Sequence, residues 1–221
     1  MDIASCIDHT LLKQTTTLPE IQKLCEDAIQ YRFAAVCVPP LFVKFAKKFL
    51  SESNIKIATV IGFPLGYSAI EAKLAETLLA IVDGADELDM VINVSAIKNN
   101  DWVYLANEIN TILPVVRNEN KIIKIIIESG VLTDDEIIKC CGLYGPAGVD
   151  YLKTSSGFAE KGATVEAVQL MRKHLPSHIK IKASGGIRNY EFAQKLIDAG
   201  AERIGSSASV EIVKQSLQKL A

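Results

Sequence analysis

Short runs of β-branched and other apolar residues alternate along this chain with longer amphipathic segments, and this alternation constrains the fold more than any other feature. The runs recur at intervals of roughly 22 to 35 residues, about the length of a strand plus a crossover helix. Eight strand–helix units in one chain predict an α/β fold, the (β/α)8 TIM barrel. A doubly wound open sheet is the alternative. The eight runs are residues 6–10, 34–38, 56–63, 87–92, 121–129, 150–155, 179–184 and 202–207.

The amphipathic segments between these runs predict helices. Thr133 and Glu136 form the S/T-x-x-E pattern of a capping box at the start of one of them. No Pro-, Gly- or Ser-rich linker and no shift in composition divides the chain, so we expect a single domain over residues 1–221. The expected helices are residues 18–32, 68–84, 102–116, 133–144, 164–175 and 189–200.

Composition excludes several classes of protein. The 221 residues are 49% hydrophobic with a formal net charge of −2, which lacks the basic bias of a nucleic-acid binder and the charge excess of a disordered chain. No apolar run approaches the roughly 18 residues that span a bilayer. We therefore expect a soluble, cytoplasmic protein without nucleic-acid or membrane partners.

The cysteines and histidines show no metal-binding pattern. The five cysteines lack CxxC spacing, and none of the three histidines is spaced helically with a carboxylate. We expect buried structural thiols, no metal and no cofactor.

Two lysines lie near the ends of apolar strands. Lys153 occurs in VDYLKTSSG and Lys182 in IKIKASGGIR. A buried ammonium is destabilised relative to the neutral amine, and two of them on consecutive strands are expected to depress each other's pKa. An amine with a lowered pKa acts as a nucleophile near neutral pH.

Strand alternation predicts which side chains enter the barrel. It directs Asp89, Lys153 and Lys182 inward near the carboxyl ends of their strands, where barrel active sites lie. Lys180 has the same parity as Lys182, so it is either a second interior candidate or a residue of the opposite, lower end. The structural alternative is a buried Lys153–Asp89 ion pair, with Lys182 reaching the rim.

Glycine-rich segments follow the last two strands. Residues 184–188 read SGGIR and residues 205–209 read GSSAS. In barrels that bind sugar phosphates, the loops after strands 7 and 8 commonly hold the phosphate. Backbone N–H groups would approach the phosphate there, and the hydroxyl of Ser206 or Ser207 would add a donor, with Arg188 as a possible source of charge.

The motifs IDHTLLK, VCVPP, VIGFPLG, ELDMVIN, YLKTSSGF, KASGGIR and RIGSS occur in this order. Over about residues 7–207 the chain resembles the deoxyribose-phosphate aldolase family of class I aldolases. The resemblance implies metal-independent, reversible cleavage of 2-deoxy-D-ribose 5-phosphate to acetaldehyde and D-glyceraldehyde 3-phosphate. It assigns the Schiff base to Lys153, perturbation of that amine to Lys182 rather than Lys180, and a proton relay to Asp89 with Lys182.

The same resemblance implies small phosphosugar and aldehyde substrates, a place in deoxyribose phosphate catabolism, and a homodimer or homotetramer. Two departures stand out: no tyrosine ends the tail QSLQKLA, and Phe158 stands where some relatives carry a lysine. Other Schiff-base barrels, such as a transaldolase-like enzyme, and a catalytically silent phosphosugar-binding barrel are the alternatives. The implied substrate-binding residues are Asp8, Thr10, Gly157, Gly185, Gly186, Gly205 and Ser207.

Overall fold

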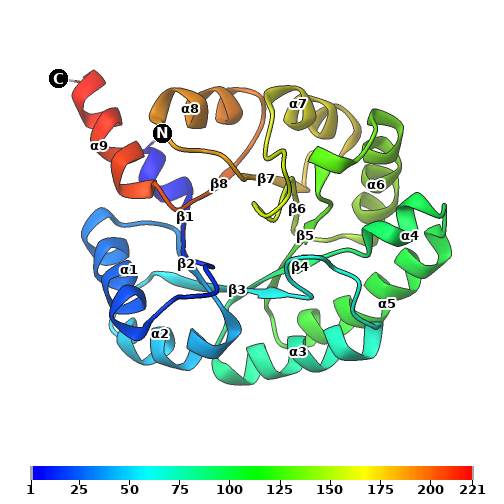
Figure 1. The fold of residues 1–221 in the computed structure, drawn as a ribbon, viewed down its shortest axis with the longest axis horizontal. Helices are drawn as coiled ribbons and strands as arrows, with labels where there is room; N and C mark the ends of the chain where they lie inside the picture. Colours follow the sequence, from blue (N-terminus) through cyan, green and yellow to red (C-terminus); the bar gives the residue numbers. More distant parts are fainter. Residues whose placement is uncertain (1, 221) are drawn as a thin grey trace.

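Eight parallel strands close into a barrel in the order of the sequence (Figure 1). The computed structural model describes residues 2–220, so Met1 and Ala221 of the predicted domain lie outside it, Ala221 being the last residue of the tail. The closed barrel confirms the predicted (β/α)8 fold and rules out the open sheet. The strands are β1 Ile7–Thr10, β2 Ala35–Val38, β3 Lys56–Ile61, β4 Glu87–Val91, β5 Ile122–Ile126, β6 Tyr151–Lys153, β7 Lys180–Ser184 and β8 Arg203–Ser206.

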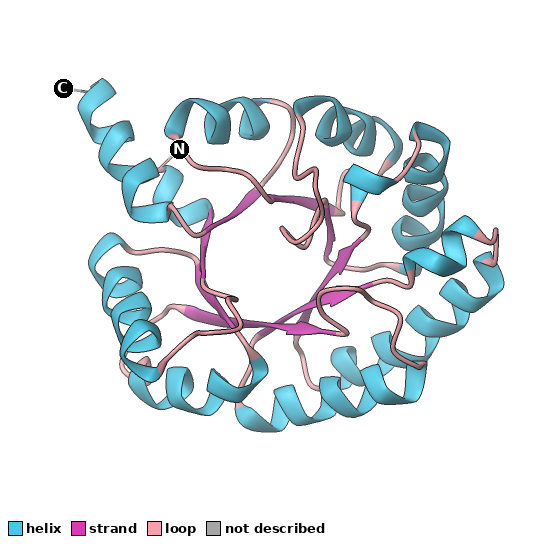
Figure 2. Ribbon diagram, in the orientation of Figure 1, coloured by secondary structure: helices cyan, strands magenta, loops and turns pink. Residues whose placement is uncertain are grey.

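The helices form a ring around the outside of this barrel (Figure 2). All six predicted helices are present, and the Thr133–Glu136 capping box is formed. The helices α2 and α4 were not predicted, because 7 and 5 residues are too few for a helical period to stand out; α9 was also missed. The helices are α1 Leu18–Tyr31, α2 Val43–Phe49, α3 Ile70–Asp83, α4 Val94–Lys98, α5 Trp102–Asn118, α6 Asp134–Ala147, α7 Val165–His174, α8 Tyr190–Asp198 and α9 Ser209–Leu220, with 3₁₀ turns η1 Ile3–Cys6, η2 Pro40–Phe42 and η3 Ser129–Val131.

Alternation along the strands sorts apolar and charged residues between the two faces of the sheet. On β4, Leu88 and Met90 are fully buried within the main hydrophobic core, whereas the intervening Asp89 pairs with lysines of other strands. Asp89 is in register with Lys124 of β5, and Lys153 of β6 is in register with Lys182 of β7. The predicted inward set is therefore confirmed.

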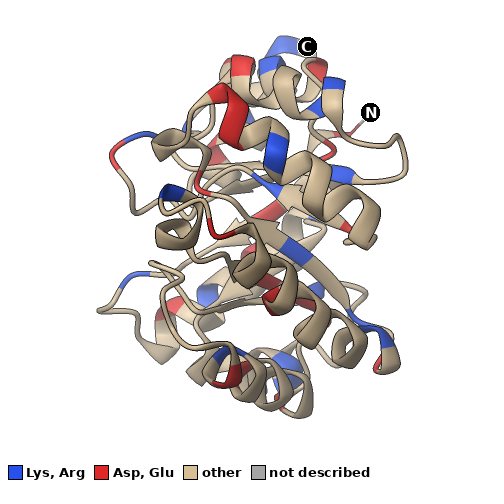
Figure 3. Ribbon diagram, turned by 90° about the vertical axis from the view of Figure 1, so that its right-hand side faces the viewer, with Lys and Arg blue, Asp and Glu red and all other residues tan. Residues whose placement is uncertain are grey.

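Charged residues of both signs occur along the outer helices and also on the central strands (Figure 3). Within residues 2–220, no helix combines the length and apolar character that a membrane crossing requires. One buried ion pair lies outside the barrel, between Lys73 of α3 and Glu108 of α5, at 2.6 Å and with both side chains inaccessible to solvent. Lys73 also donates to the carbonyl of Val91, which ties α3 to the strand that carries Asp89.

We expect Glu108→Gln to lower the free energy of unfolding by about 3 kcal/mol or more, because it leaves the Lys73 ammonium buried without its counter-charge. The double variant Lys73→Met/Glu108→Leu should be more stable than Glu108→Gln, because it removes both charges. Urea denaturation followed by circular dichroism measures these values. Lys23→Met, which breaks an exposed pair with Asp27 on α1, is the control and should leave stability nearly unchanged. A double variant less stable than Glu108→Gln would contradict this account.

Candidate active site

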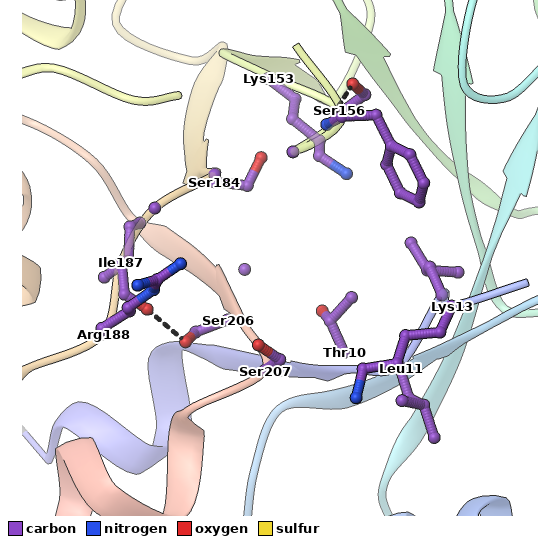
Figure 4. A pocket seen from close by; sticks show the side chains of 16 residues that line it. Thr10, Leu11, Lys13, Lys153, Ser156, Ser184, Ile187, Arg188, Ser206 and Ser207 are labelled. Atoms are coloured by element: carbon purple, nitrogen blue, oxygen red, sulfur yellow. Dashed lines mark hydrogen bonds between the residues drawn. The ribbon is translucent and has the colours of Figure 1, made fainter. Parts of the chain in front are cut away.

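A cavity of about 310 Å³ opens at the carboxyl ends of the strands, with the Lys153 side chain reaching into it from β6 (Figure 4). Thr10 lies across the cavity from Lys153, next to Ser206 and Ser207. Of the predicted site residues, six line this cavity together with Lys153: Thr10, Gly157, Gly185, Gly186, Gly205 and Ser207.

The other predicted site residues lie beneath the cavity, in the interior of the barrel. Asp8, Asp89 and Lys182 are completely buried. The Lys182 ammonium donates to Asp8 and, at 2.7 Å, to Asp89. Asp8 thus contacts cationic side chains, and its contact with a substrate stays a prediction.

Three further charged residues complete this cluster, and the sequence reasoning did not assign them to the site. Lys124 lies 2.8 Å from Asp89 and 2.5 Å from Glu87. Arg203 lies 2.6 Å from Asp8 and 3.4 Å from Glu87. Opposite charges therefore alternate around a closed ring in the order Arg203, Asp8, Lys182, Asp89, Lys124 and Glu87.

This ring contains three carboxylates and three cations, so its formal charge is balanced. Lys153 is a seventh member attached from above, and its ammonium is 2.7 Å from Asp89 Oδ2, the oxygen that Lys182 also contacts. Among the ion pairs of residues 2–220, Lys153 takes part in this one alone. Four cationic side chains thus share three carboxylates, and Lys153 is the surplus cation.

The pKa shifts follow this arrangement. Burial raises the pKa of a carboxyl group, but the ammonium groups of Lys124, Lys153 and Lys182 hold the pKa of Asp89 well below its usual range. Burial lowers the pKa of a lysine, but Asp8 and Asp89 together raise the pKa of Lys182 above its usual value. Asp89 is therefore a carboxylate and Lys182 an ammonium.

Lys153 shifts in the opposite direction. Burial lowers its pKa, Asp89 opposes that effect, and the Lys182 ammonium lowers it further, so the net pKa is below the usual value for lysine. The expectation that the two lysines depress each other's pKa is thus wrong for Lys182. The reason is that Lys182 has two carboxylate partners, whereas Lys153 shares one with it.

The structure also decides between the open alternatives for the lysines. The buried Lys153–Asp89 ion pair of the structural alternative is present, but Lys182 is fully buried and does not reach the rim. Lys180 is exposed at the start of β7, where its ammonium lies 5.6 Å from the centre of the Tyr151 ring. It belongs to the lower end of the barrel, away from the cavity.

Lys124 could have been found from the sequence, because it is the single lysine of IIKII (residues 122–126) and has the alternation of an inward residue. Arg203 gave a weaker signal, since it lies at the first residue of its strand. Cys37 and His9, which lie on β2 and β1, are buried. Burial raises the pKa of Cys37 to about 11 and lowers that of His9 to about 4, consistent with an unreactive thiol and a neutral imidazole.

Several residues that line the cavity have unpaired backbone N–H groups. Within residues 2–220, the N–H groups of Gly157, Gly185, Gly186 and Ser207 donate to no protein acceptor. Gly157, Gly185 and Gly186 have φ values of +89°, +89° and +76°, which favour glycine. Unpaired N–H groups of residues that line one cavity are a suitable site for a phosphate.

The side chains around the cavity differ in whether they offer a further hydrogen-bond donor or a positive charge. The Ser206 hydroxyl donates to the carbonyl of Ile187 and accepts from the N–H of Ala208, so it is already engaged, whereas Ser207 is exposed to the cavity. Arg188 also lines the cavity. Phe158 packs edge-on against Phe63 with ring centres 5.1 Å apart and brings no charge to the rim.

The comparisons with known proteins agree with this geometry. The family profile described as "DeoC/LacD family aldolase" matches residues 3–215. The chain belongs to this family. It is 51% identical to the deoxyribose-phosphate aldolase of Thermococcus gammatolerans over 216 residues, 97% of this chain and 96% of the relative. It is 48% identical to the enzyme of the same name from Caldanaerobacter subterraneus, over 97% and 94% of the two chains.

A solved structure has the same fold. The deoxyribose phosphate aldolase of Aeropyrum pernix superimposes with a TM-score of 0.90 at 30% identity, covering 99% of this chain and 92% of that one. The two structures agree over nearly the full length of both chains. The buried charges of this DeoC/LacD family aldolase therefore lie inside a barrel of the same type as that of the relative.

We expect Lys182→Met to move the acid limb of the pH–rate profile of this family member to higher pH, because it removes the cation that lowers the Lys153 pKa. A raised pKa keeps the amine protonated to higher pH, so activity appears later as pH rises. Steady-state rates of aldol cleavage between pH 5 and 10 measure the shift. Lys180→Met removes an exposed lysine of the same strand and should leave the limb in place. An unmoved limb in Lys182→Met would show that the two lysines are not coupled.

Proposed function

We propose that this chain is a class I deoxyribose-phosphate aldolase with Lys153 as its nucleophile. It reversibly cleaves 2-deoxy-D-ribose 5-phosphate to acetaldehyde and D-glyceraldehyde 3-phosphate, a step of deoxyribose phosphate catabolism. The observation that carries the assignment of Lys153 is its position as the surplus cation of a buried cluster, at the floor of a cavity with unpaired backbone donors. A barrel that only binds phosphosugars would need those donors but no buried amine with a lowered pKa.

The reaction begins at the amine. Neutral Lys153 attacks the C1 aldehyde of the open-chain sugar, and loss of water leaves an iminium ion. This cation withdraws electrons from the adjacent carbon and so stabilises the carbanion character that develops at C2. The Asp89 carboxylate lies beside the iminium nitrogen, where its charge is complementary.

Cleavage then breaks the bond between C2 and C3. The C3 hydroxyl loses its proton and becomes the carbonyl of glyceraldehyde 3-phosphate, while the electron pair of the bond forms an enamine on Lys153. We assign the proton transfer to Asp89 acting with Lys182, the groups nearest to the amine. Protonation of the enamine at C2 and hydrolysis release acetaldehyde and return the free lysine.

The substrate end opposite C1 is placed by the glycine loops. We assign its phosphate to the N–H groups of Gly157, Gly185, Gly186 and Ser207, and Gly205 and Thr10 also line this cavity. A Cβ at Gly205 would lie 3.0 Å from Cβ of Ser184 and 3.1 Å from Cε of Lys182, closer than an ordinary van der Waals contact, so a side chain there would press on Lys182. No metal or cofactor enters this proposal.

Treatment with sodium borohydride in the presence of deoxyribose 5-phosphate should fix a covalent adduct on Lys153, because hydride reduces the iminium to a stable secondary amine. Peptide mass mapping locates the adduct. Lys153→Ala should give none, whereas Lys180→Met should give as much as the unaltered chain. An adduct on another lysine, or none in the unaltered chain, would refute the assignment of Lys153.

We also infer that the protein acts as a homo-oligomer in the cytoplasm. The outer face of α3 exposes Leu78, Leu79 and Val82, with 80% of Val82 accessible, and an apolar helix face of this kind favours burial against a second copy. The Aeropyrum pernix relative is described as a tetramer, and either a dimer or a tetramer fits the exposed face. Five free, buried cysteines suit a reducing compartment.

We expect the unaltered chain to elute as a dimer or tetramer, and Leu79→Glu to shift it towards the monomer, because a carboxylate in an apolar interface loses its hydration. Size-exclusion chromatography with light scattering measures both masses. Leu217→Glu alters a similarly exposed leucine on α9 and is the matched control. A monomeric unaltered chain would overturn the proposed assembly, and an unshifted Leu79→Glu would exclude this face.

A further inference from the structure

Glu128, just after β5, has a backbone conformation that its residue type disfavours. Its φ and ψ are both 54°, in the left-handed region. Three other non-glycine residues of the described chain have positive φ: Arg32 caps α1, and Asn100 and Asn120 are asparagines, which tolerate this region. Glu128 has neither explanation. Strain of this kind persists where the surroundings require it, and it clusters at functional sites.

The contacts of the Glu128 side chain all lead to one residue of the loop after β6. Glu128 is 7% exposed. Its two oxygens accept from the N–H of Ser156 at 3.2 and 3.3 Å, and one of them also accepts from the Ser156 hydroxyl. That hydroxyl in turn accepts from the N–H of Phe158 at 3.1 Å. The carboxylate therefore fixes the backbone on both sides of Gly157.

No lysine, arginine or histidine of residues 2–220 forms an ion pair with this carboxylate. A buried carboxylate without a counter-charge is costly, so its hydrogen bonds to Ser156 are the interactions that offset its desolvation. An apolar residue would avoid this cost but would leave the Ser156 N–H unpaired.

The turn that contains Glu128 holds the same loop at two further points. The N–H of Ser129 donates to the carbonyl of Thr154 at 2.7 Å, before Ser156. Gly130 packs against the backbone of Lys161, after Ser156, so closely that a Cβ would collide with it. The turn over residues 128–130 and the loop over residues 154–161 therefore form one interlocked unit.

These contacts divide the donors of the loop into two groups. The N–H and the hydroxyl of Ser156 are both occupied by Glu128, although Ser156 lines the cavity. The N–H of Gly157, the next residue, donates to nothing within residues 2–220 and lies at the cavity. Glu128 itself does not line the cavity, so it acts only through Ser156.

We propose that Glu128 is a positioning residue, which holds Ser156 so that the Gly157 N–H faces the phosphate of the substrate. This inference rests on the proposed function and adds to it a residue that controls affinity for the phosphorylated end alone. It also implies that Ser156, despite lining the cavity, gives no hydrogen bond to the phosphate.

Simple charge repulsion and the positioning role predict opposite effects of neutralising Glu128 on the affinity for phosphate. The direction of the change therefore tests the proposal. A carboxylate near a bound phosphate repels it, so neutralising Glu128 should tighten phosphate binding if repulsion is its only influence. If Glu128 positions the loop, neutralising it should weaken binding, because glutamine keeps one acceptor oxygen and loses the charge that strengthens the bonds to Ser156.

The experiment compares Glu128→Gln, Ser156→Ala and Glu160→Gln with the unaltered chain, using 2-deoxyribose 5-phosphate and unphosphorylated 2-deoxyribose. For Glu128→Gln and Ser156→Ala we expect KM for the phosphorylated sugar to rise roughly tenfold, with kcat nearly unchanged. We expect kcat/KM for the unphosphorylated sugar to stay the same in both. Glu160 is exposed on the same loop, so Glu160→Gln removes an equal charge without the clamp and should leave KM for the phosphorylated sugar unchanged or lower.

Three results would overturn the proposal: an unchanged or lowered KM for the phosphorylated sugar in Glu128→Gln, an equal loss for both sugars, or a rise in KM in Glu160→Gln as large as that in Glu128→Gln. If the unaltered chain cleaved neither sugar, the proposed function would fail by itself. Titration calorimetry with inorganic phosphate alone then tests the positioning role. A weaker Kd in Glu128→Gln would support it, and an unchanged Kd would overturn it.

Discussion

The surplus of one cation over the carboxylates at the centre of the barrel is the constraint on which the site depends. Asp89 contacts the ammonium groups of Lys124, Lys153 and Lys182, and one carboxylate cannot stabilise three ammonium groups equally. Lys124 and Lys182 have further carboxylate partners, Glu87 and Asp8. Two unit charges about 4 Å apart interact by about 4 kcal/mol at an effective dielectric of 20, so one missing partner is enough to shift the pKa of an amine substantially. The shared carboxylate thus separates a nucleophile from a permanent cation.

Closure of the parallel sheet makes this concentration of charge possible. Inward charged residues of six strands, β1 and β4 to β8, meet in the interior, and each finds its partners on other strands. The apolar residues between them face the helices and supply the hydrophobic burial that offsets the desolvation of the charges. The buried Lys73–Glu108 pair is a second case, outside the barrel, of paired charges surrounded by apolar residues. Lys73 also binds the carbonyl of Val91 and so fixes the carboxyl end of β4 just beyond Asp89. The loops that follow the strands do not contribute to this charged cluster. In this protein they supply unpaired backbone N–H donors to the cavity.

Much of this arrangement could be predicted from the sequence, and the parts that could not have physical reasons. The recurrence of short apolar runs between amphipathic segments was sufficient to predict eight strands, and period-two alternation within the runs placed Asp89, Lys153 and Lys182 in the interior. It could not give the pKa of Lys182, because that value depends on Asp8, which lies 174 residues away along the chain and next to it in the barrel. Lys124 carried the same alternation signal as Lys182 but no motif drew attention to it. The role of Glu128 could not be predicted from the sequence, because neither its left-handed backbone conformation nor its hydrogen bonds to Ser156 have a signature in the local sequence.

The excess cation has a consequence for the protons exchanged with the solvent. A neutral amine and an aldehyde contain one proton fewer than the iminium ion and water that they form. The lowered pKa of Lys153 favours the neutral amine, and formation of the iminium ion from that form takes up one proton from the solvent. Hydrolysis of the intermediate returns it. The heat of forming the adduct from the neutral amine therefore depends on the ionisation enthalpy of the buffer, although the overall reaction neither consumes nor produces a proton.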